Sequence, residues 1–465
     1  LSSLTSNTLI IRPNVLTSGE RYAFSLTATI GTASSTAMTE YKFVNEPPLP
    51  GIFTVSPLEG FSLQTEFLLV CSQWLDTDLP LRYSFAYESS NRDWIALNTG
   101  SPANSLPITL PAGLASLNYS IVIQARITDS LGAISTINQT VIVRPRPVNV
   151  TSLATGLASL DKTSDIFTQF ISSVAQTIST PKAPSTPTNT TSANCINDCS
   201  GNGICNNGKC QCNEGYSLDD CSVTRAELQQ RQALRQDLIS ALAQSFNLSL
   251  TNVVPVTAEV VQQQSAILSQ LTSSPQELST SAKLSAVNHM NNLLRSAKAS
   301  DSTASIDLET ASVVGSTINN IAKAAFSIAQ SNTTTTTSNF DSGAQKEISQ
   351  QITAVINNLL TSVLNAASVG EAPFEIVQDT LSIVASRQTS STLDNLNVQV
   401  SDSRIVMPNN LSDILNKRAR KYLQSPSTTN SDVIDVQVVL YTENPYSYAS
   451  GSRNLSSSVL TLALT

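Results

Sequence analysis

The chain has 465 residues, of which only 13% are charged, and its formal net charge is -8 at pH 7. This balance argues against nucleic acid as a partner, because proteins that bind a phosphate backbone gather Lys and Arg on one surface. Hydrophobic residues make up 40% of the chain, which is enough for buried cores, and the length predicts about three domains. No run approaches the ~18 apolar residues of a membrane-spanning helix, so we expect no membrane insertion within this chain.

The chain starts at Leu1 without the basic and apolar regions of a signal peptide. We therefore expect it to be an internal piece of a longer protein, with any signal peptide or membrane anchor outside it.

Residues 1–147 alternate between apolar and polar positions with a period of two, for example over 22–30, 81–87 and 120–127. Pro and Gly clusters separate these segments. Short strands at this spacing are typical of β-sandwiches. The break from Pro47 to Gly51 predicts two of them, the first lacking its start.

Four motifs follow one another in this region: Asn45-Glu-Pro-Pro-Leu-Pro-Gly51, Val55-Ser-Pro-Leu-Glu-Gly60, Trp74-Leu-Asp-Thr-Asp78 and Thr128-Asp-Ser-Leu-Gly-Ala133. Their order and spacing over residues 8–147 resemble the receptor-for-egg-jelly (REJ) region of polycystin-1-like proteins. The resemblance implies that residues 1–46 are the end of a fibronectin-III-like sandwich and that residues 47–147 form a REJ-type fibronectin-III-like sandwich.

Several residues of this region have both a structural and a functional interpretation. We expect Trp74 to pack between sheets rather than bind a ligand. We expect Cys71 to be a small buried hydrophobe in a strand rather than half of an intermolecular disulfide. Asp76, Asp78 and Asp129 could bind calcium, but turn and cap roles are commoner for short acidic side chains, and no EF-hand spacing is present.

Residues 148–180 carry apolar side chains at intervals of three and four from Leu153 to Ile178. This pattern predicts an amphipathic helix. Few basic residues line it, so we expect it to pack on a neighbouring domain rather than on a membrane surface. Residues 181–194 are rich in Ser, Thr and Pro and have no apolar pattern, which predicts a stiff linker.

Six of the seven cysteines lie in residues 195–221 with the spacing C-x3-C-x5-C-x4-C-x-C-x8-C. So short a segment buries too little apolar surface to fold without cross-links, and disulfides persist only in an oxidising compartment. The rival interpretation is a zinc site. It is disfavoured because structural zinc sites use paired C-x2-4-C motifs and the one histidine, His289, is far away in the sequence.

The cysteine spacing, with Gly201 and Gly203 before the third cysteine, resembles an EGF-like module. Six cysteines allow 15 pairings by arithmetic alone. The resemblance implies the pairs Cys195 with Cys205, Cys199 with Cys210, and Cys212 with Cys221.

Eight Asn-x-Ser/Thr sequons are present, each a weak signal by itself. Together with the cysteines they predict N-glycosylation on the secretory pathway. The acceptors are Asn118, Asn138, Asn149, Asn189, Asn247, Asn332, Asn410 and Asn454.

Residues 222–386 follow a period of 3.6 and predict five or six helices, including one near residues 260–271 and a short one near residues 374–377. A heptad coiled coil is less favoured, because helix breakers recur along the segment. Three capping boxes mark predicted helix starts. They pair Thr224 with Glu227, Ser274 with Glu277, and Ser342 with Gln345.

Residues 387–465 return to strand patterns, after one over 381–386, most clearly over 397–401, 433–441 and 459–464. Helices followed by strands, with the sequence Tyr441-Thr-Glu-Asn-Pro-Tyr446, resemble the GAIN domain of adhesion receptors and polycystin-1-like proteins. In those families the domain ends in a Cys- and Trp-containing GPS motif with a self-cleaving His-Leu-Ser/Thr tripeptide. Nothing of that kind follows Tyr446, so we expect the cleavage site downstream or absent.

The fold class predicted for the whole chain is therefore multidomain. It consists of N-terminal all-β sandwiches, a small disulfide-rich module and a C-terminal α+β region in which helices precede a β-sandwich. We expect no catalytic residues, no metal site and no cofactor. His289, beside Met290 in a helical pattern, is expected to be a surface or core residue rather than a base.

Two functions from different classes fit this organisation. The first, which we favour, is the ectodomain of a polycystin-1-like receptor at a cell or ciliary surface, acting in adhesion, ligand binding or mechanical coupling. Its expected partners are an extracellular protein or glycan and, through parts outside this chain, a polycystin-2-like channel. The second is a structural component of a ciliary hair or cell coat, built from the same modules.

Overall fold

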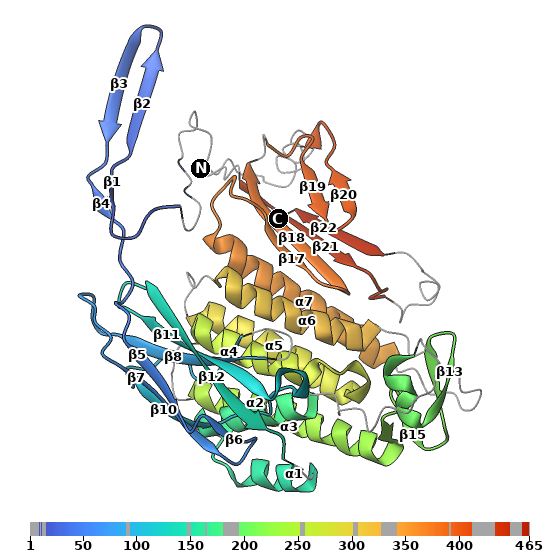
Figure 1. The fold of residues 1–465 in the computed structure, drawn as a ribbon. Coiled ribbons are helices and arrows are strands. Elements are labelled where there is room, and N and C mark those ends of the chain that lie inside the picture. The colour runs from blue at the N-terminus through green and yellow to red at the C-terminus, as the bar shows by residue number, and fades with distance from the viewer. Residues whose placement is uncertain are drawn as a thin grey trace.

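The computed structural model describes most of the chain, namely residues 9, 11, 15–89, 94–146, 150–162, 165–179, 195–251, 256–300, 306–326, 342–389, 392–411, 433–446 and 458–464. A β-rich region comes first, a disulfide-rich segment follows, and helices then precede a second β region. Figure 1 shows the helices between the N-terminal sandwich and the C-terminal sheet.

A hairpin projects from the N-terminal side of the molecule (Figure 1). Strand β1 (Arg21–Tyr22) pairs with β4 (Lys42–Phe43), and β2 (Ser25–Ile30) pairs with β3 (Ala33–Met38). Every residue of β2 and β3 is exposed. Where we predicted the end of a sandwich, the described residues thus form a two-stranded ribbon on which no second sheet packs.

Residues 51–146 form a β-sandwich. One sheet has the order β10-β7-β5, from β5 (Ile52–Ser56), β7 (Glu66–Ser72) and β10 (Ser105–Thr109). The other has the order β6-β12-β11-β8-β9, and only β6 and β12 are parallel within it. Its strands are β6 (Glu59–Phe61), β8 (Arg82–Glu88), β9 (Trp94–Ala96), β11 (Ser120–Thr128) and β12 (Ile134–Arg144), and a 3-10 turn, η1 (Ala115–Leu117), precedes β11.

The predicted period of two builds the core of this sandwich. Along β11 every second side chain is buried, as the pleat of a strand requires. The rings of Phe53 and Phe85 stack across the core with their centroids 5.9 Å apart. The two sheets therefore bury one shared apolar layer.

Two helices occupy the segment where we predicted one. They are α1 (Val150–Ser159) and α2 (Asp165–Ser179). The helices pack closely where α1 has Gly156, since a Cβ there would lie 3.2 Å from the ring of Phe170. The apolar spacing is helical both before and after the break between α1 and α2, so periodicity alone did not reveal that the helix is interrupted. The expectation that this segment packs on a neighbouring domain is confirmed, because its buried residues share a core with the helices that follow.

The disulfide-rich segment is compact and leads directly into the next helix. It contains η2 (Ile196–Gly201), β13 (Gly203–Asn206), β14 (Lys209–Cys212), β15 (Tyr216–Ser217) and β16 (Val223–Thr224). The Oγ1 atom of Thr224 accepts a hydrogen bond of 3.2 Å from the backbone N–H of Glu227, as the first capping box predicts.

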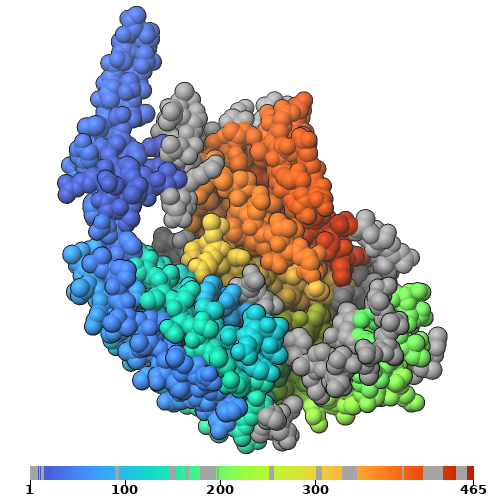
Figure 2. All heavy atoms as spheres, viewed as in Figure 1, coloured from blue at the N-terminus to red at the C-terminus, as the bar shows by residue number. Residues whose placement is uncertain are grey.

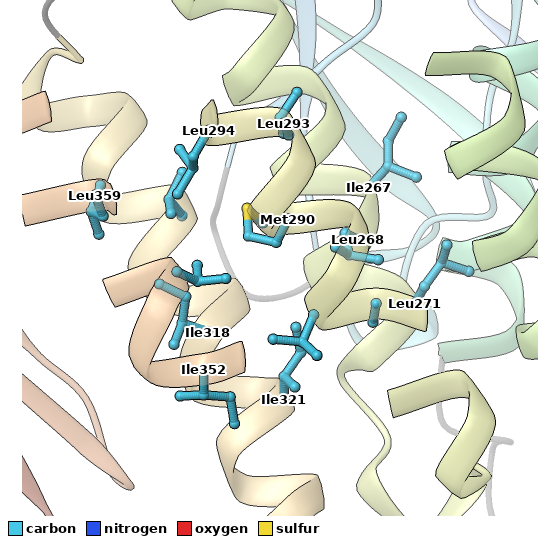
Figure 3. Close-up of a cluster of buried hydrophobic side chains, with 14 of the residues drawn as sticks. Ile267, Leu268, Leu271, Met290, Leu293, Leu294, Ile318, Ile321, Ile352 and Leu359 are labelled. Carbon is cyan, nitrogen blue, oxygen red and sulfur yellow. The ribbon is translucent and has the colours of Figure 1, made fainter. Parts of the chain in front are cut away.

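Five long helices form the centre of the molecule. Their apolar faces meet in a core that Figure 3 shows for α4 to α7. The helices are α3 (Arg225–Thr251), α4 (Ala258–Thr272), α5 (Thr280–Ser300), α6 (Leu308–Phe326) and α7 (Ser342–Ala366).

The second predicted capping box is wrong. Ser274 precedes a short 3-10 turn, η3 (Pro275–Glu277), and its side chain makes no cap hydrogen bond. Helix α5 instead begins at Thr280, where the Oγ of Ser279 accepts a hydrogen bond of 3.1 Å from the N–H of Ala282. At the third box, α7 begins at Ser342 and Gln345 donates its amide to the carbonyl of Ala325.

The C-terminal region is a four-stranded sheet of order β17-β18-β21-β22 with a hairpin, β19–β20, on one face. Alternate residues of β21 reach different layers, since Val439 and Tyr441 face the helices whereas Val436 and Val438 face the hairpin. The strands are β17 (Phe374–Val377), β18 (Leu381–Thr389), β19 (Asn397–Val400), β20 (Ser403–Val406), β21 (Val433–Tyr441) and β22 (Val459–Leu464).

The short helix predicted near residues 374–377 is wrong, because this segment is strand β17. Phe374 and Ile376 are buried and alternate with exposed residues, which is the period of a strand. A segment of four residues is too short to distinguish this period from that of a helix. Ile376 packs against Gly315 of α6, where a Cβ would approach its side chain to 2.5 Å.

One buried cation joins three helices. Arg235 of α3 is fully buried, and its guanidinium pairs with Glu277 of η3 at 2.7 Å. The same guanidinium donates to the carbonyl of Leu271 at 2.8 Å and reaches the carbonyl of Ile178 at 3.5 Å. These carbonyls belong to the last turns of α4 and α2, where the helix dipole favours a positive charge.

We expect Glu277→Ala to lower the free energy of unfolding by about 3–5 kcal/mol, because it leaves Arg235 buried without a counter-charge. The matched control is Glu59→Ala. Its pair with Arg144 has side chains 59% and 44% exposed, and such pairs contribute about 0–1 kcal/mol. Urea unfolding measures both, and equal small losses in the two variants would contradict the prediction.

Candidate functional site

A cleft lies where the outer face of the five-stranded sheet meets the first turns of α4 and α6. It has a volume of about 240 Å³. Its floor and walls come from β8, β9 and β11 on one side and from the two helix starts on the other. In Figure 2 the blue-to-cyan atoms of the sandwich abut the yellow atoms of the helices.

Charged side chains bridge the two sides of the cleft. Arg126 of β11 pairs with Glu309 of α6 at 2.8 Å, and the amide of Gln262 of α4 donates to the same carboxylate at 3.0 Å. Arg82 of β8 donates to the carbonyl of Gly100 at 3.0 Å. The carboxylate of Asp307 accepts a 2.7 Å hydrogen bond from the N–H of Thr310 and so caps α6.

The remaining lining mixes an indole ring with amides and hydroxyls. Trp94 of β9 is half-buried, and Asn98 and Thr99 follow it along the rim. Such a surface combines one apolar platform with several hydrogen-bonding groups, which suits reversible binding of a polar ligand. Histidine and cysteine are absent from the lining, so it offers no familiar nucleophile–base pair.

A buried polar cluster lies beside the cleft and joins the sandwich to two helices. The hydroxyl of Tyr87 on β8 lies 3.3 Å from the hydroxyl of Ser172 on α2. Gln270 of α4 donates to the Tyr87 hydroxyl at 3.0 Å and to the carbonyl oxygen of Gln176 at 2.9 Å. Burial raises the pKa of Tyr87 to about 12, so this hydroxyl stays protonated.

Neither the cleft nor the Tyr87 cluster was predicted from the sequence. Both are built from strands and helices far apart in the chain, and no local motif marks them. One weak signal was available: Gln270 lies beside Leu268 and Leu271 in the predicted helix, and a Gln buried there requires a polar partner.

The structure contains three disulfides in residues 195–221. They join Cys195 with Cys205, Cys199 with Cys210, and Cys212 with Cys221, which are the pairs that the EGF-like spacing implies. The sulfurs of this segment therefore bond to one another rather than to a metal.

Cys71 and Trp74 belong to the core of the sandwich. Cys71 is completely buried in β7 as a free thiol, and burial raises its pKa to about 12. Trp74 is 7% exposed and lies in the same apolar cluster. Both residues are where we expected them.

The carboxylates of Asp76, Asp78 and Asp129 lie within 4.8 Å of one another at one end of the sandwich. Hydrogen bonds to backbone and side-chain donors account for two of them. Asp76 accepts from the N–H of Asp78, and Asp129 accepts from the N–H groups of Leu131 and Ala133 and from the amide of Asn45. These are the turn roles that we predicted.

His289 is a buried residue of α5. It is 3% exposed, its Nε2 atom lies 3.2 Å from the Oε1 atom of Gln264, and its ring contacts that of Phe246 edge to face. Burial lowers the pKa of His289 to about 4. It is a neutral core histidine, which is one of the two locations we expected.

Four of the sequon asparagines lie among the described residues, and all four are exposed. They are Asn118, Asn138, Asn247 and Asn410. Asn149, Asn189, Asn332 and Asn454 lie outside the described residues, as do the predicted linker at 181–194 and the side chain of Ser342.

Comparison with known proteins identifies the first part of the chain. The family model of the REJ domain matches residues 1–180. Residues 1–180 are therefore similar to a REJ domain. We had predicted the REJ resemblance over residues 8–147 alone. The matched region is longer and includes α1 and α2.

Two curated relatives share part of this sequence. The human polycystin family receptor for egg jelly is 29% identical over 103 residues, and the mouse protein of the same name is 30% identical over 105 residues. Each match covers 20% of this chain and 5% of the relative. In the described residues, no helix combines the length and the apolar character needed to cross a membrane.

We expect the stability of the protein to fall with acidification because of His289. An unfolded histidine titrates near 6.5, so the unfolded state binds more protons than the folded state between 6.5 and about 4. The free energy of unfolding should drop across this interval by up to about 3 kcal/mol. Urea unfolding at several pH values measures how the free energy of unfolding changes with pH. This change should be smaller in His289→Gln than in the unaltered protein. Equal slopes in the two proteins would contradict the prediction.

We expect thiol labelling to distinguish two classes of cysteine. Without reductant the native protein should incorporate no label, and the denatured protein should incorporate it only at Cys71. Peptide mapping by mass spectrometry gives the sites, and Cys71→Ser is the control that should abolish labelling altogether. Label on any cysteine of residues 195–221 in the native, unreduced protein would refute this assignment.

Proposed function

We propose that this chain is an extracellular fragment of a polycystin-1-like surface receptor, on the outer side of a plasma or ciliary membrane. The REJ domain match and the two receptor relatives support this proposal, and the three disulfides fit passage through an oxidising compartment. Under it, the sandwich is fibronectin-III-like, residues 195–221 are EGF-like and residues 222–465 are GAIN-like. The chain spans about 5% of the length of its relatives, so the whole receptor's activity is itself a proposal.

The role that the geometry supports best is mechanical coupling. The observation that carries it is the Tyr87 cluster, where a strand of the REJ sandwich shares buried hydrogen bonds with α2 and α4. An apolar contact continues this junction, because Ala266 of α4 is part of the sandwich core. Force or ligand binding at the sandwich would thus reach the helices without passing through a flexible linker.

The helices are in turn bonded to the C-terminal sheet. Asn319 of α6 donates to the carboxylate of Asp379 at 2.7 Å and accepts from the N–H of Thr380, just before β18. The core is continuous from α1 to β21. An extracellular protein or glycan bound near the sandwich would act through this path on whatever follows the sheet, including a polycystin-2-like channel assembled through other parts of the receptor.

Optical-tweezer unfolding from the two ends of the chain tests the proposal. We expect the sandwich and the helices to unfold in one step. In Tyr87→Phe the buried Gln270 amide loses an acceptor. This should lower the free energy of unfolding by about 1–3 kcal/mol and favour unfolding in two separate steps. Tyr41→Phe is the control, because Tyr41 is 70% exposed. If the sandwich unfolds separately from the helices in the unaltered chain, the coupling proposal is wrong.

A further inference from the structure

One sequon lies next to the cleft. The outward side chains of β12 include Ile134, Thr136 and Asn138, all exposed, and Ile134 lines the cleft. Across the ladder Asn138 is paired with Gln124, and Thr136 is paired with Arg126, which also lines the cleft. Asn138 is therefore a diagonal neighbour of Arg126, and such pairs lie about 7–8 Å apart.

The side chain of Asn138 is positioned for modification. Its Oδ1 atom accepts a hydrogen bond of 3.2 Å from the amide of Gln124. This bond engages the oxygen and not the Nδ2 atom, the atom that receives a glycan, and the residue as a whole is exposed. The sequon Thr140 is exposed on the same face.

The cleft offers what a saccharide chain binds. The ring of Trp94 provides an apolar platform for the C–H face of a sugar, and the side chains of Arg82 and Gln262 provide donors for its hydroxyl oxygens. From β12 to β8 the distance across the sheet is two strand spacings, about 10 Å, which a few linked sugar rings span.

We propose that an N-linked glycan on Asn138 lies along the outer face of the sheet, enters the cleft and fastens the REJ sandwich to α4 and α6. This inference rests on the secretory passage included in the proposed function. The glycan arrives from a polyprenyl-pyrophosphate donor. The C1–O bond to pyrophosphate breaks, C1 bonds to Nδ2 of Asn138, Nδ2 loses a proton and the lipid pyrophosphate leaves with the electron pair.

The test compares two variants that leave Asn138 itself intact. Thr140→Val destroys the sequon, whereas Thr140→Ser keeps it. Both are expressed in secreting animal cells, and peptide mass spectrometry reports occupancy at Asn138 and at the remote loop sequon Asn118. The chain has two tryptophans, and Trp74 is only 7% exposed, so acrylamide quenching of fluorescence reports chiefly on Trp94.

We expect Thr140→Val to increase the quenching and to lower the melting temperature by about 2–4 °C, and we expect Thr140→Ser to change neither. Asn118→Gln, which removes a glycan elsewhere, should leave the quenching unchanged. In Trp94→Leu the glycan should remain attached to Asn138. Adding Thr140→Val to this variant removes the glycan, and the melting temperature should then no longer fall.

Two results would overturn the inference and leave secretory passage supported. The first is occupancy at Asn118 with none at Asn138. The second is occupancy at Asn138 with identical quenching in Thr140→Val and Thr140→Ser. Bare asparagines at all four described sequons would overturn both the inference and the secretory part of the proposed function.

Discussion

The buried guanidinium of Arg235 is the interaction on which the arrangement of the helices depends. The last turns of α2 and α4 point their unpaired carbonyls at the same place, and two such ends would repel each other without a cation between them. Arg235 meets both, and Glu277 neutralises its remaining charge. Because α2 lies within the residues that match the REJ domain and α4 lies outside them, this one side chain also fixes how the matched part of the chain meets the rest.

The junction between sandwich and helices follows from that placement. With α2 and α4 held together, Ser172 and Gln270 converge on the hydroxyl of Tyr87. The pair of Arg126 with Glu309 closes the same junction near the surface, with side chains 26% and 46% exposed. The buried contacts give the junction its stability, and Arg126 of the exposed pair lines the cleft.

Local patterns predicted the elements well wherever burial alone sets the period. The alternation of β11 and the apolar stripe that became α7 are of this kind, and the structure shows a strand and a helix there. The three disulfides instead follow the pairs that the EGF-like resemblance implies. Errors occurred where a segment is too short to show its period, as in β17, or where one helical pattern continues across a break, as between α1 and α2. The cleft and the Tyr87 cluster could not be predicted, since their residues meet only after distant elements pack.

The burial of Cys71 has a consequence for the disulfides far from it. Disulfide exchange needs an attacking thiolate, and the chain's one free thiol, Cys71, is held protonated inside the sandwich. A folded molecule therefore carries no internal nucleophile that could scramble Cys195–Cys205 and its two companions. The native connectivity is protected by the packing of an unrelated β-strand.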